Sequence, residues 1–244
     1  MSNERKCAVI TGRNYCNILT MVRALGQSGY DVEVLRVFKS KPSGLNLLRK
    51  MKPECYSKYV NKYEECIAND NPQKVIDHLL RMSDSQEKKL LIPVDDYLAC
   101  TVDEALDVLK TKYIVPSVGN MQGEISRLMD KNEQKKLASD FNLPVLNSVL
   151  IKSENGCFTI PDEINYPCFI KPNVSMKSTK AKMSKCDDRE SLERILGRYA
   201  AAGDFEILVE DFADIKHEYS ILGVATPDGI TAPGLFRVID GGHR

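Results

Sequence analysis

The sequence predicts an α/β fold, with a largely parallel sheet in residues 1–120 and a mixed α and β region after it. In residues 1–120, short apolar runs typical of buried strands alternate with segments that have the apolar spacing of amphipathic helices. Strands separated by helices of this length favour a parallel sheet with right-handed crossovers. From Asn120 onward the alternation ends, and helices, strands and a turn-rich segment follow in a different order.

The elements expected in residues 1–120 are three strands and three helices. The strands are expected at residues 7–11, 32–37 and 90–94. The helices carry apolar residues at helical spacing: Ile18, Leu19, Val22 and Leu25; then Val75, Ile76, Leu79, Leu80 and Met82; then Leu98, Val102, Leu106 and Leu109. Gly29 follows the first helix, at the position where a left-handed cap costs glycine least.

This alternation looks like a Rossmann-type half, but the turn after the first strand reads TGRNYCN. Because the G-x-G-x-x-G pattern is absent, the turn argues against dinucleotide binding. A small-molecule substrate site at the carboxyl ends of the strands remains open, with Gly12 and Arg13 at one end and Asp95 and Asp96 at another. The alternative for each residue is structural: Gly12 makes a turn and Asp96 caps the next helix.

The elements expected after Asn120 begin with a helix capped by Asp130. Glu133 stands three residues later, as in a capping box. Strands are expected at residues 148–151, 168–171, 181–185, 206–209, 218–224 and 230–239, with a helix through Leu192, Ile195, Leu196 and Tyr199. Residues 226–229, Thr-Pro-Asp-Gly, form a tight-turn sequence between the last two strands.

The charge balance excludes some partner classes. Lys and Arg number 34, as do Asp and Glu, so the formal net charge is zero. We therefore expect no nucleic acid and no membrane as partner. The start of the chain lacks a signal-peptide pattern, and the 8 cysteines include no C-x-x-C pair. These features favour reduced thiols and a cytoplasmic location.

Two lysines stand where an anion could be bound. Asp130-Lys131 opens a helix, whose free amide groups and added ammonium group favour phosphate. In the run YPCFIKP, Lys171 ends an apolar strand that Pro172 stops, so its charge must reach solvent or an anion. For each lysine the alternative is an ordinary solvated side chain.

Two longer segments add polar groups. Residues 173–185, NVSMKSTKAKMSK, supply hydroxyl and ammonium donors suited to a polyphosphate, although such a run is also typical of a solvated loop. Residues 207–222, ILVEDFADIKHEYSIL, contain a strand that runs into Glu210, a short linker and a second strand from Glu218. A linker of this kind can offer backbone groups to an adenine edge, and acidic side chains can accept from the exocyclic amine and the ribose.

In order and spacing, these four features resemble the ATP-grasp superfamily of ligases. Within it the sequence looks nearest to stand-alone carboxylate–amine ligases of the D-aspartate ligase or carbamoyl-phosphate synthase-like type, on the strength of SKYV (57–60), IPVDD (92–96) and SMKSTKA (175–181). The resemblance implies a Rossmann-like pre-ATP-grasp domain at 1–120, the small lobe at 121–205 and the incomplete start of the large lobe at 206–244.

The resemblance also implies roles for particular residues. Lys131 and Lys171 would contact phosphate, Glu210 would face the adenine amine, and Glu218 would bind ribose. The linker backbone would come from Asp211, Phe212 and Ala213, and the loop that closes over phosphate would include Ser175, Lys177, Ser178 and Lys180. That loop contains no glycine between Lys171 and Lys185, so side chains would have to do more of the binding.

The activity implied is ATP- and Mg²⁺-dependent joining of a small carboxylate to a small amine through an acyl phosphate. No catalytic residue is assigned. No metal ligand is assigned either, since the only carboxylate after Glu218 near a strand end, other than that of the turn residue Asp228, is Asp240, and a single carboxylate is a poor site. The 244 residues are therefore expected to be part of a longer enzyme and inactive alone. A homodimer is left open. Two alternatives remain: a non-catalytic ATP-binding module or inactive fragment, and an unrelated Rossmann-type dehydrogenase or transferase.

Overall fold

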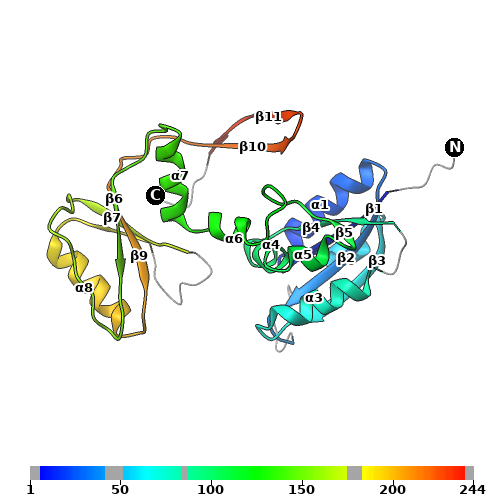
Figure 1. Cartoon of the computed structure of the whole chain (residues 1–244), viewed down its shortest axis with the longest axis horizontal. Coiled ribbons are helices and arrows are strands. Elements are labelled where there is room, and N and C mark those ends of the chain that lie inside the picture. Colours follow the sequence, from blue (N-terminus) through cyan, green and yellow to red (C-terminus); the bar gives the residue numbers. More distant parts are fainter. Residues whose placement is uncertain (1–5, 42–51, 84–86, 175–182, 240–244) are drawn as a thin grey trace. The chain divides into compact units, whose positions relative to one another are not determined.

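The computed structural model describes residues 6–41, 52–83, 87–174 and 183–239 (Figure 1). Contacts divide the chain into two compact units. Unit 1 comprises residues 1–145 and 173–180, and unit 2 comprises residues 146–172 and 181–244. Each unit is described by itself.

Unit 1 is built around a five-stranded parallel sheet with the order β3-β2-β1-β4-β5. This confirms the α/β class and the parallel pairing expected from the alternation. Its elements are β1 (Cys7–Gly12), α1 (Tyr15–Gln27), β2 (Asp31–Phe38), the 3₁₀ helix η1 (Pro53–Tyr56), β3 (Val60–Ile67), α3 (Pro72–Arg81), β4 (Lys89–Pro93), α4 (Asp96–Asp103), α5 (Leu106–Leu109), β5 (Tyr113–Ile114), α6 (Glu124–Leu128) and α7 (Lys131–Asp140).

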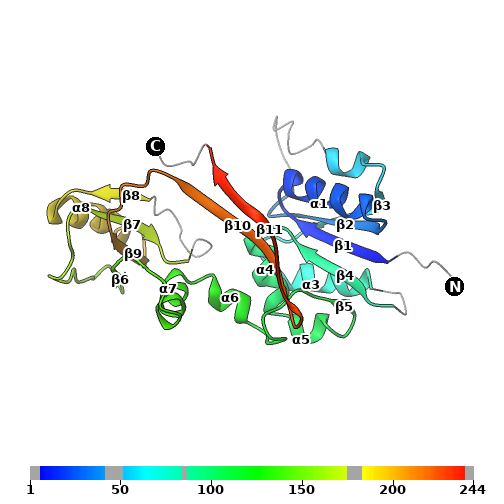
Figure 2. The same ribbon diagram turned by 90° about the horizontal axis from the view of Figure 1, so that it is seen from above.

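Helices cover both faces of this sheet. Side chains alternate along a strand, so Val9 and Ile10 of β1 enter different clusters. Ile10 packs with Ile18 and Val22 of α1, whereas Val9 packs with residues of α3 and α4 on the other face. Figure 2 shows the helices on the two sides of the strands. The fully apolar strand centres predicted from sequence are explained by this double burial.

The third helix expected in unit 1 is not a single helix in the structure. The apolar positions predicted one helix from Leu98 to Leu109, but the structure breaks it into α4 and α5. Ala105 leaves helical geometry at φ −114° and ψ 19°. Leu106 and Leu109 are both buried after the break. The prediction that these apolar residues are buried is therefore confirmed, and the prediction of one continuous helix is wrong.

A buried ion pair attaches η1 to the sheet. Arg36 of β2 pairs with Glu54, and the Tyr63 hydroxyl donates to the same carboxylate at 3.2 Å. Burial, with the adjacent Glu54 charge, raises the pKa of Tyr63. No local pattern predicts this pair, because Arg36 lies inside an apolar run and Glu54 lies 18 residues away.

Unit 2 contains a four-stranded sheet with the order β6-β9-β7-β8 and a separate two-stranded sheet of β10 and β11. Both are antiparallel. The elements are β6 (Ser148–Lys152), β7 (Cys168–Pro172), β8 (Ser184–Cys186), α8 (Arg189–Ala200), β9 (Glu206–Asp211), β10 (Glu218–Thr226) and β11 (Gly229–Val238). The expected strand at 181–185 overlaps β8, and its residues 181 and 182 lie outside the described part.

α8 packs on one face of the four-stranded sheet, as Figure 1 shows. Leu192 and Leu196 are fully buried against Ile170 and Val209. The helix begins with a capping box between Asp188 and Ser191, which the sequence reading missed. At α7 only half of the expected capping box forms. The Asp130 side chain accepts from the Asn132 and Glu133 amides, but the Asp130 amide donates to the Arg127 carbonyl and not to Glu133.

Candidate functional site

The candidate site lies on the face of the four-stranded sheet opposite α8. In the antiparallel pairing of β7 with β9, Lys171 lies across from Leu208 and Phe169 across from Glu210. Since alternate residues face alternate sides, these four side chains share one face. Ile170 and Val209, the intervening residues, pack under α8. The strands therefore present a lysine, a glutamate and two apolar side chains together.

Lys171 and Glu210 form an ion pair on this face. The Lys171 Nζ lies 2.6 Å from a Glu210 carboxylate oxygen, with side-chain exposures of 23% and 7%. A carboxylate this buried needs a charged or hydrogen-bonding partner, because desolvation otherwise penalises the ionised form. The resemblance implies that the two residues contact different parts of a nucleotide. The structure brings them into direct contact.

The linker after Glu210 is shorter than expected, because β9 extends through Asp211. The Asp211 amide donates to the Asn147 carbonyl at 3.1 Å, and the Phe212 amide donates to the Pro167 carbonyl at 3.1 Å. The Phe212 ring is 38% exposed, and the Lys185 ammonium lies 4.9 Å from its centroid. The first residue of the predicted linker backbone is thus part of the sheet.

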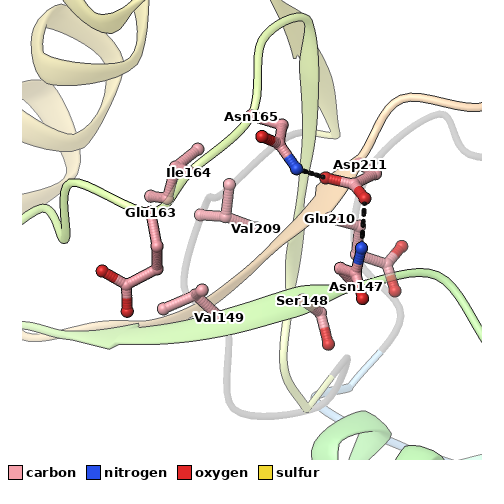
Figure 3. A pocket seen from close by; sticks show the side chains of 9 residues that line it. All are labelled: Asn147, Ser148, Val149, Glu163, Ile164, Asn165, Val209, Glu210 and Asp211. Carbon is pink, nitrogen blue, oxygen red and sulfur yellow. Dashed lines mark hydrogen bonds between the residues drawn. The ribbon is translucent and has the colours of Figure 1, made fainter.

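A pocket of about 320 Å³ lies beside this strand end (Figure 3). Its apolar lining includes Val149, Ile164 and Val209, which belong to or pack against the cluster under α8. Asp211 lines it too, held by Asn147 and Asn165. Glu210 and its partner across the sheet, Ser148, line the pocket as well, so the pocket adjoins the end of the strand that carries the Lys171–Glu210 pair.

The Lys131 region differs from its prediction in one respect. The amides at the start of α7 are already bonded: the Lys131 amide donates to the Asn173 carbonyl at 3.3 Å, and Asp130 caps the next two. They are therefore not free for an anion. The Lys131 ammonium also donates to the Asn173 carbonyl, at 3.2 Å. What remains for phosphate binding is the charge of this ammonium group.

The candidate substrate residues of unit 1 meet where β1 and β4 end. The Arg13 amide donates to Asp95 at 2.6 Å, and its Nε lies 3.3 Å from the other carboxylate oxygen. The Arg13 guanidinium also stacks over the Tyr97 ring at 4.4 Å. Asp95, not Asp96, caps α4, by accepting from the Leu98 amide. Asp96 is exposed.

Gly12 has a packing reason to be glycine. A Cβ added there would lie 2.4 Å from the Val94 Cγ2. The residue is buried at the end of β1, so the loops after β1 and β4 approach closely only without a side chain. Adjacent strands β1 and β4 lead to connections on opposite sides of the sheet, which is where open α/β sheets bind ligands.

The remaining predicted site residues are either exposed or outside the described part of the chain. Glu218 begins β10 and is exposed. Ser175, Lys177, Ser178 and Lys180 lie outside the described residues, as does Asp240. Asn147 and Asn165 were not predicted, since single polar residues next to strands carry no local signal for a contact across the sheet.

The described residues contain neither a cluster of metal ligands nor a membrane-spanning helix. No group of three or more His, Cys, Asp or Glu side chains there could hold a metal ion. None of the helices described is long and apolar enough to cross a membrane. All eight cysteines are free thiols.

Solved structures share the fold of this chain. No family model and no curated protein sequence matches it. An L-amino acid ligase from Bacillus licheniformis superposes with a TM-score of 0.69 at 12% identity, over 97% of this chain and 51% of that one. An N5-carboxyaminoimidazole synthetase from Staphylococcus aureus gives 0.63 at 16% identity, over 95% and 54%.

A third structure, an N5-carboxyaminoimidazole synthase from Aspergillus clavatus in complex with ADP and 5-aminoimidazole ribonucleotide, gives a TM-score of 0.62 at 16% identity. It covers 100% of this chain and 56% of that one. This chain therefore spans about half the length of the ligases and synthases it matches. Over that length it shares the mixed α/β fold of these ligases and synthases.

Proposed function

We propose that this chain forms the nucleotide-binding part of an ATP-dependent carboxylate–amine ligase that works through an acyl phosphate. The observation that carries the proposal is the Lys171–Glu210 pair, next to a strand end on an otherwise apolar sheet face. The fold shared with ligases, one of them solved with ADP, supports it. The narrower D-aspartate ligase type and a cytoplasmic location are parts of the same proposal. So is the division into 1–120, 121–205 and 206–244.

ATP can offer a new hydrogen-bonding partner to each residue of this ion pair. A phosphate oxygen would take the Lys171 ammonium, and the exocyclic amine of adenine would donate to Glu210. Charge-assisted hydrogen bonds of this kind are about twice as strong as neutral ones. Phe169, which is partly exposed, would offer apolar contact to the purine, with the buried Leu208 beside it. In the free protein, the ion pair keeps both charged side chains on the face where the nucleotide would bind.

The base would be read by the linker backbone. The Phe212 amide is occupied by Pro167, so it cannot serve the base. We therefore assign the Asp211 carbonyl and the Ala213 amide to the adenine edge. Glu218 would accept from the ribose hydroxyls. Lys131 and the loop residues Ser175, Lys177, Ser178 and Lys180 would add donors to the phosphates.

The reaction has two steps. A substrate carboxylate attacks the γ-phosphorus of ATP, which forms an acyl phosphate and releases ADP. An amine then attacks the acyl carbon, loses a proton, and expels inorganic phosphate. The contribution of the chain is to position the nucleotide and stabilise the charge on the transferring group. The described residues do not fit a Mg²⁺ site, so no step is assigned to the metal here.

Arg13 is the proposed contact for the carboxylate substrate. Its main-chain amide and Nε are held by Asp95, and Tyr97 supports the guanidinium plane. The guanidinium is 43% exposed, so its outer edge faces solvent. A fixed and accessible guanidinium is suited to bind a carboxylate in bidentate fashion. Gly12 and Asp96 would shape the same loops.

An ADP-release assay tests the proposal. The full-length protein is incubated with ATP and Mg²⁺ over a panel of amino acids, and ADP and new amide products are measured. We expect ADP release that depends on both a carboxylate and an amine. ATP binding without ADP release would indicate a non-catalytic module. Binding of a dinucleotide or methyl donor, with no binding of ATP, would indicate an unrelated Rossmann-type enzyme.

A further inference from the structure

A polar cluster encloses the carboxylate of Asp211 at the end of β9. The Asn147 Nδ2 donates to one oxygen at 2.8 Å, and the Asn165 Nδ2 donates to the other at 3.2 Å. Figure 3 shows the two amides reaching Asp211 from different segments. Asn147 directly precedes β6, and Asn165 lies in the connection before β7. We call these three residues the Asp211 cluster.

The same segments hold the main chain at this point. The Asp211 amide donates to the Asn147 carbonyl, and the Phe212 amide donates to the Pro167 carbonyl, both at 3.1 Å. Four hydrogen bonds therefore anchor two consecutive residues between two flanking segments. Such anchoring leaves the next peptide groups little freedom to shift.

The Asp211 side chain itself points away from the face that carries Lys171. Its neighbour Glu210 faces Lys171, and successive strand residues face opposite sides. A nucleotide on that face cannot touch the Asp211 carboxylate. The cluster can act on it only through the main chain of residues 211–213.

We propose that Asn147 and Asn165 are positioning residues that set base selectivity by holding the Asp211–Ala213 main chain. This inference rests on the proposed function, because it needs adenine to be read by that main chain. Hydrogen bonds weaken steeply when distance or angle departs from the optimum. A shift of the main chain of residues 211–213 would therefore weaken its hydrogen bonds to the adenine before it affected other contacts of the nucleotide. Lys171 lies on β7, a different strand, so phosphate contacts would persist.

The test compares three ligands on purified full chain. Isothermal titration calorimetry measures the Kd of ADP, GDP and inorganic tripolyphosphate for the parent, Asn165→Ala and Asn165→Asp. The aspartate variant replaces the amide donor by an acceptor facing the Asp211 carboxylate. We expect both variants to weaken ADP by about fivefold or more, which corresponds to one lost hydrogen bond. The ADP-to-GDP preference should fall, while tripolyphosphate binding changes less than about twofold.

An exchange variant provides the rescue. In Asn165→Asp/Asp211→Asn, the amide and the carboxylate trade places, so the contact between the two positions is restored and Asn147 still faces an amide oxygen. This variant should recover ADP affinity and selectivity. As a matched control, Lys152→Met removes an exposed ion pair with Glu206 between the same strands β6 and β9. It should leave all three affinities unchanged.

The outcomes separate the two proposals. A parent protein that binds neither ADP nor tripolyphosphate would end the proposed function, and this inference with it. A parent that binds ADP while the Asn165 variants lose ADP and tripolyphosphate equally, or lose neither, would overturn the positioning role alone. An exchange variant that folds but fails to recover ADP selectivity would also overturn it. Far-UV circular dichroism on every variant separates these results from misfolding.

Discussion

The Lys171 ammonium lies 2.6 Å from the Glu210 carboxylate, across two antiparallel strands, on a face otherwise lined by Phe169 and Leu208. Each residue would be costly to bury there without the other. The pair therefore has a structural role in the free protein and, in the proposed function, a binding role in the nucleotide complex. The two roles predict different results for single and double substitutions.

Lys171→Met should lower the free energy of unfolding by about 3 kcal/mol, because it leaves a nearly buried carboxylate without its ammonium partner. Lys171→Met/Glu210→Gln should cost clearly less, because both charges are removed together. Urea unfolding followed by circular dichroism measures both. Equal losses in the single and double variants would show that the pair does not stabilise the sheet.

The folded double variant should bind ATP more weakly by more than about tenfold, since a charge-assisted contact contributes about 1.5–3 kcal/mol. Calorimetry at fixed salt measures this loss. Lys185→Met is a useful comparison, because it removes a neighbouring charge that lies over Phe212 and not against Glu210. Unchanged ATP affinity in the double variant would remove Lys171 and Glu210 from the nucleotide site.

Glu218→Gln should reduce the preference for ATP over 2′-deoxy-ATP. If the carboxylate accepts from the ribose hydroxyls, the parent binds 2′-deoxy-ATP more weakly than ATP. The variant lacks the carboxylate, so the difference between its two affinities should be smaller. Glu218 is exposed, so the substitution should change stability little. Competition binding with the two nucleotides measures the ratio, and Glu190→Gln, at the start of α8, serves as the control. The same ratio in parent and variant would identify Glu218 as an ordinary surface residue.

Elements with strong periodicity could be predicted from sequence, and those set by tertiary contacts could not. The strands at 7–11 and 32–37 are almost entirely buried and Leu91 is buried at the centre of the strand at 90–94, so their apolar runs were clear. β3 was missed because polar residues such as Asn61, Lys62 and Glu64 interrupt its apolar pattern at the edge of the sheet. The break between α4 and α5 was missed because the apolar spacing continues across it.

The candidate site divides in the same way. Lys171 and Glu210 stood out because each is a charge at the end of an apolar run. Their contact with each other depends on the register of β7 against β9, which no local pattern specifies. Asn147 and Asn165 reach Asp211 from 64 and 46 residues away, so their role could be recognised only once the strands were paired.

Gly12→Ala should destabilise unit 1 by about 1–3 kcal/mol, the usual cost of forcing extra volume into a packed region. The added Cβ would lie 2.4 Å from the Val94 Cγ2 and 3.0 Å from the Ile18 Cγ1. Gly197→Ala provides the opposite control: it lies within α8, nothing lies within 4 Å of its added Cβ, and alanine should stabilise the helix by about 0.5–1 kcal/mol. Thermal unfolding of the two variants should therefore shift in opposite directions. A neutral Gly12→Ala would mean that the two loops separate freely.

Substitutions at Asp95 should change the free energy of unfolding, whereas substitution of Arg13 should change substrate binding. Asp95→Ala removes the cap of α4 and should cost about 1 kcal/mol, whereas Asp95→Asn keeps an oxygen that accepts from the Leu98 amide and should cost less. Arg13→Met removes a guanidinium that is 43% exposed, so unfolding should change little. If Arg13 binds the carboxylate substrate, this variant should raise the KM for that substrate by about tenfold or more while ADP affinity stays the same.

Arg189→Met is the matched control for the Arg13 variant, since Arg189 is 46% exposed and also pairs with carboxylates, but lies on α8. Steady-state assays with varied carboxylate at saturating ATP, beside calorimetry with ADP, give the two quantities for each variant. The expected pattern is a raised carboxylate KM for Arg13→Met alone. An equal effect of both substitutions, or an Arg13→Met effect on ADP as large as that on the carboxylate, would show that the loops after β1 and β4 do not form the substrate site.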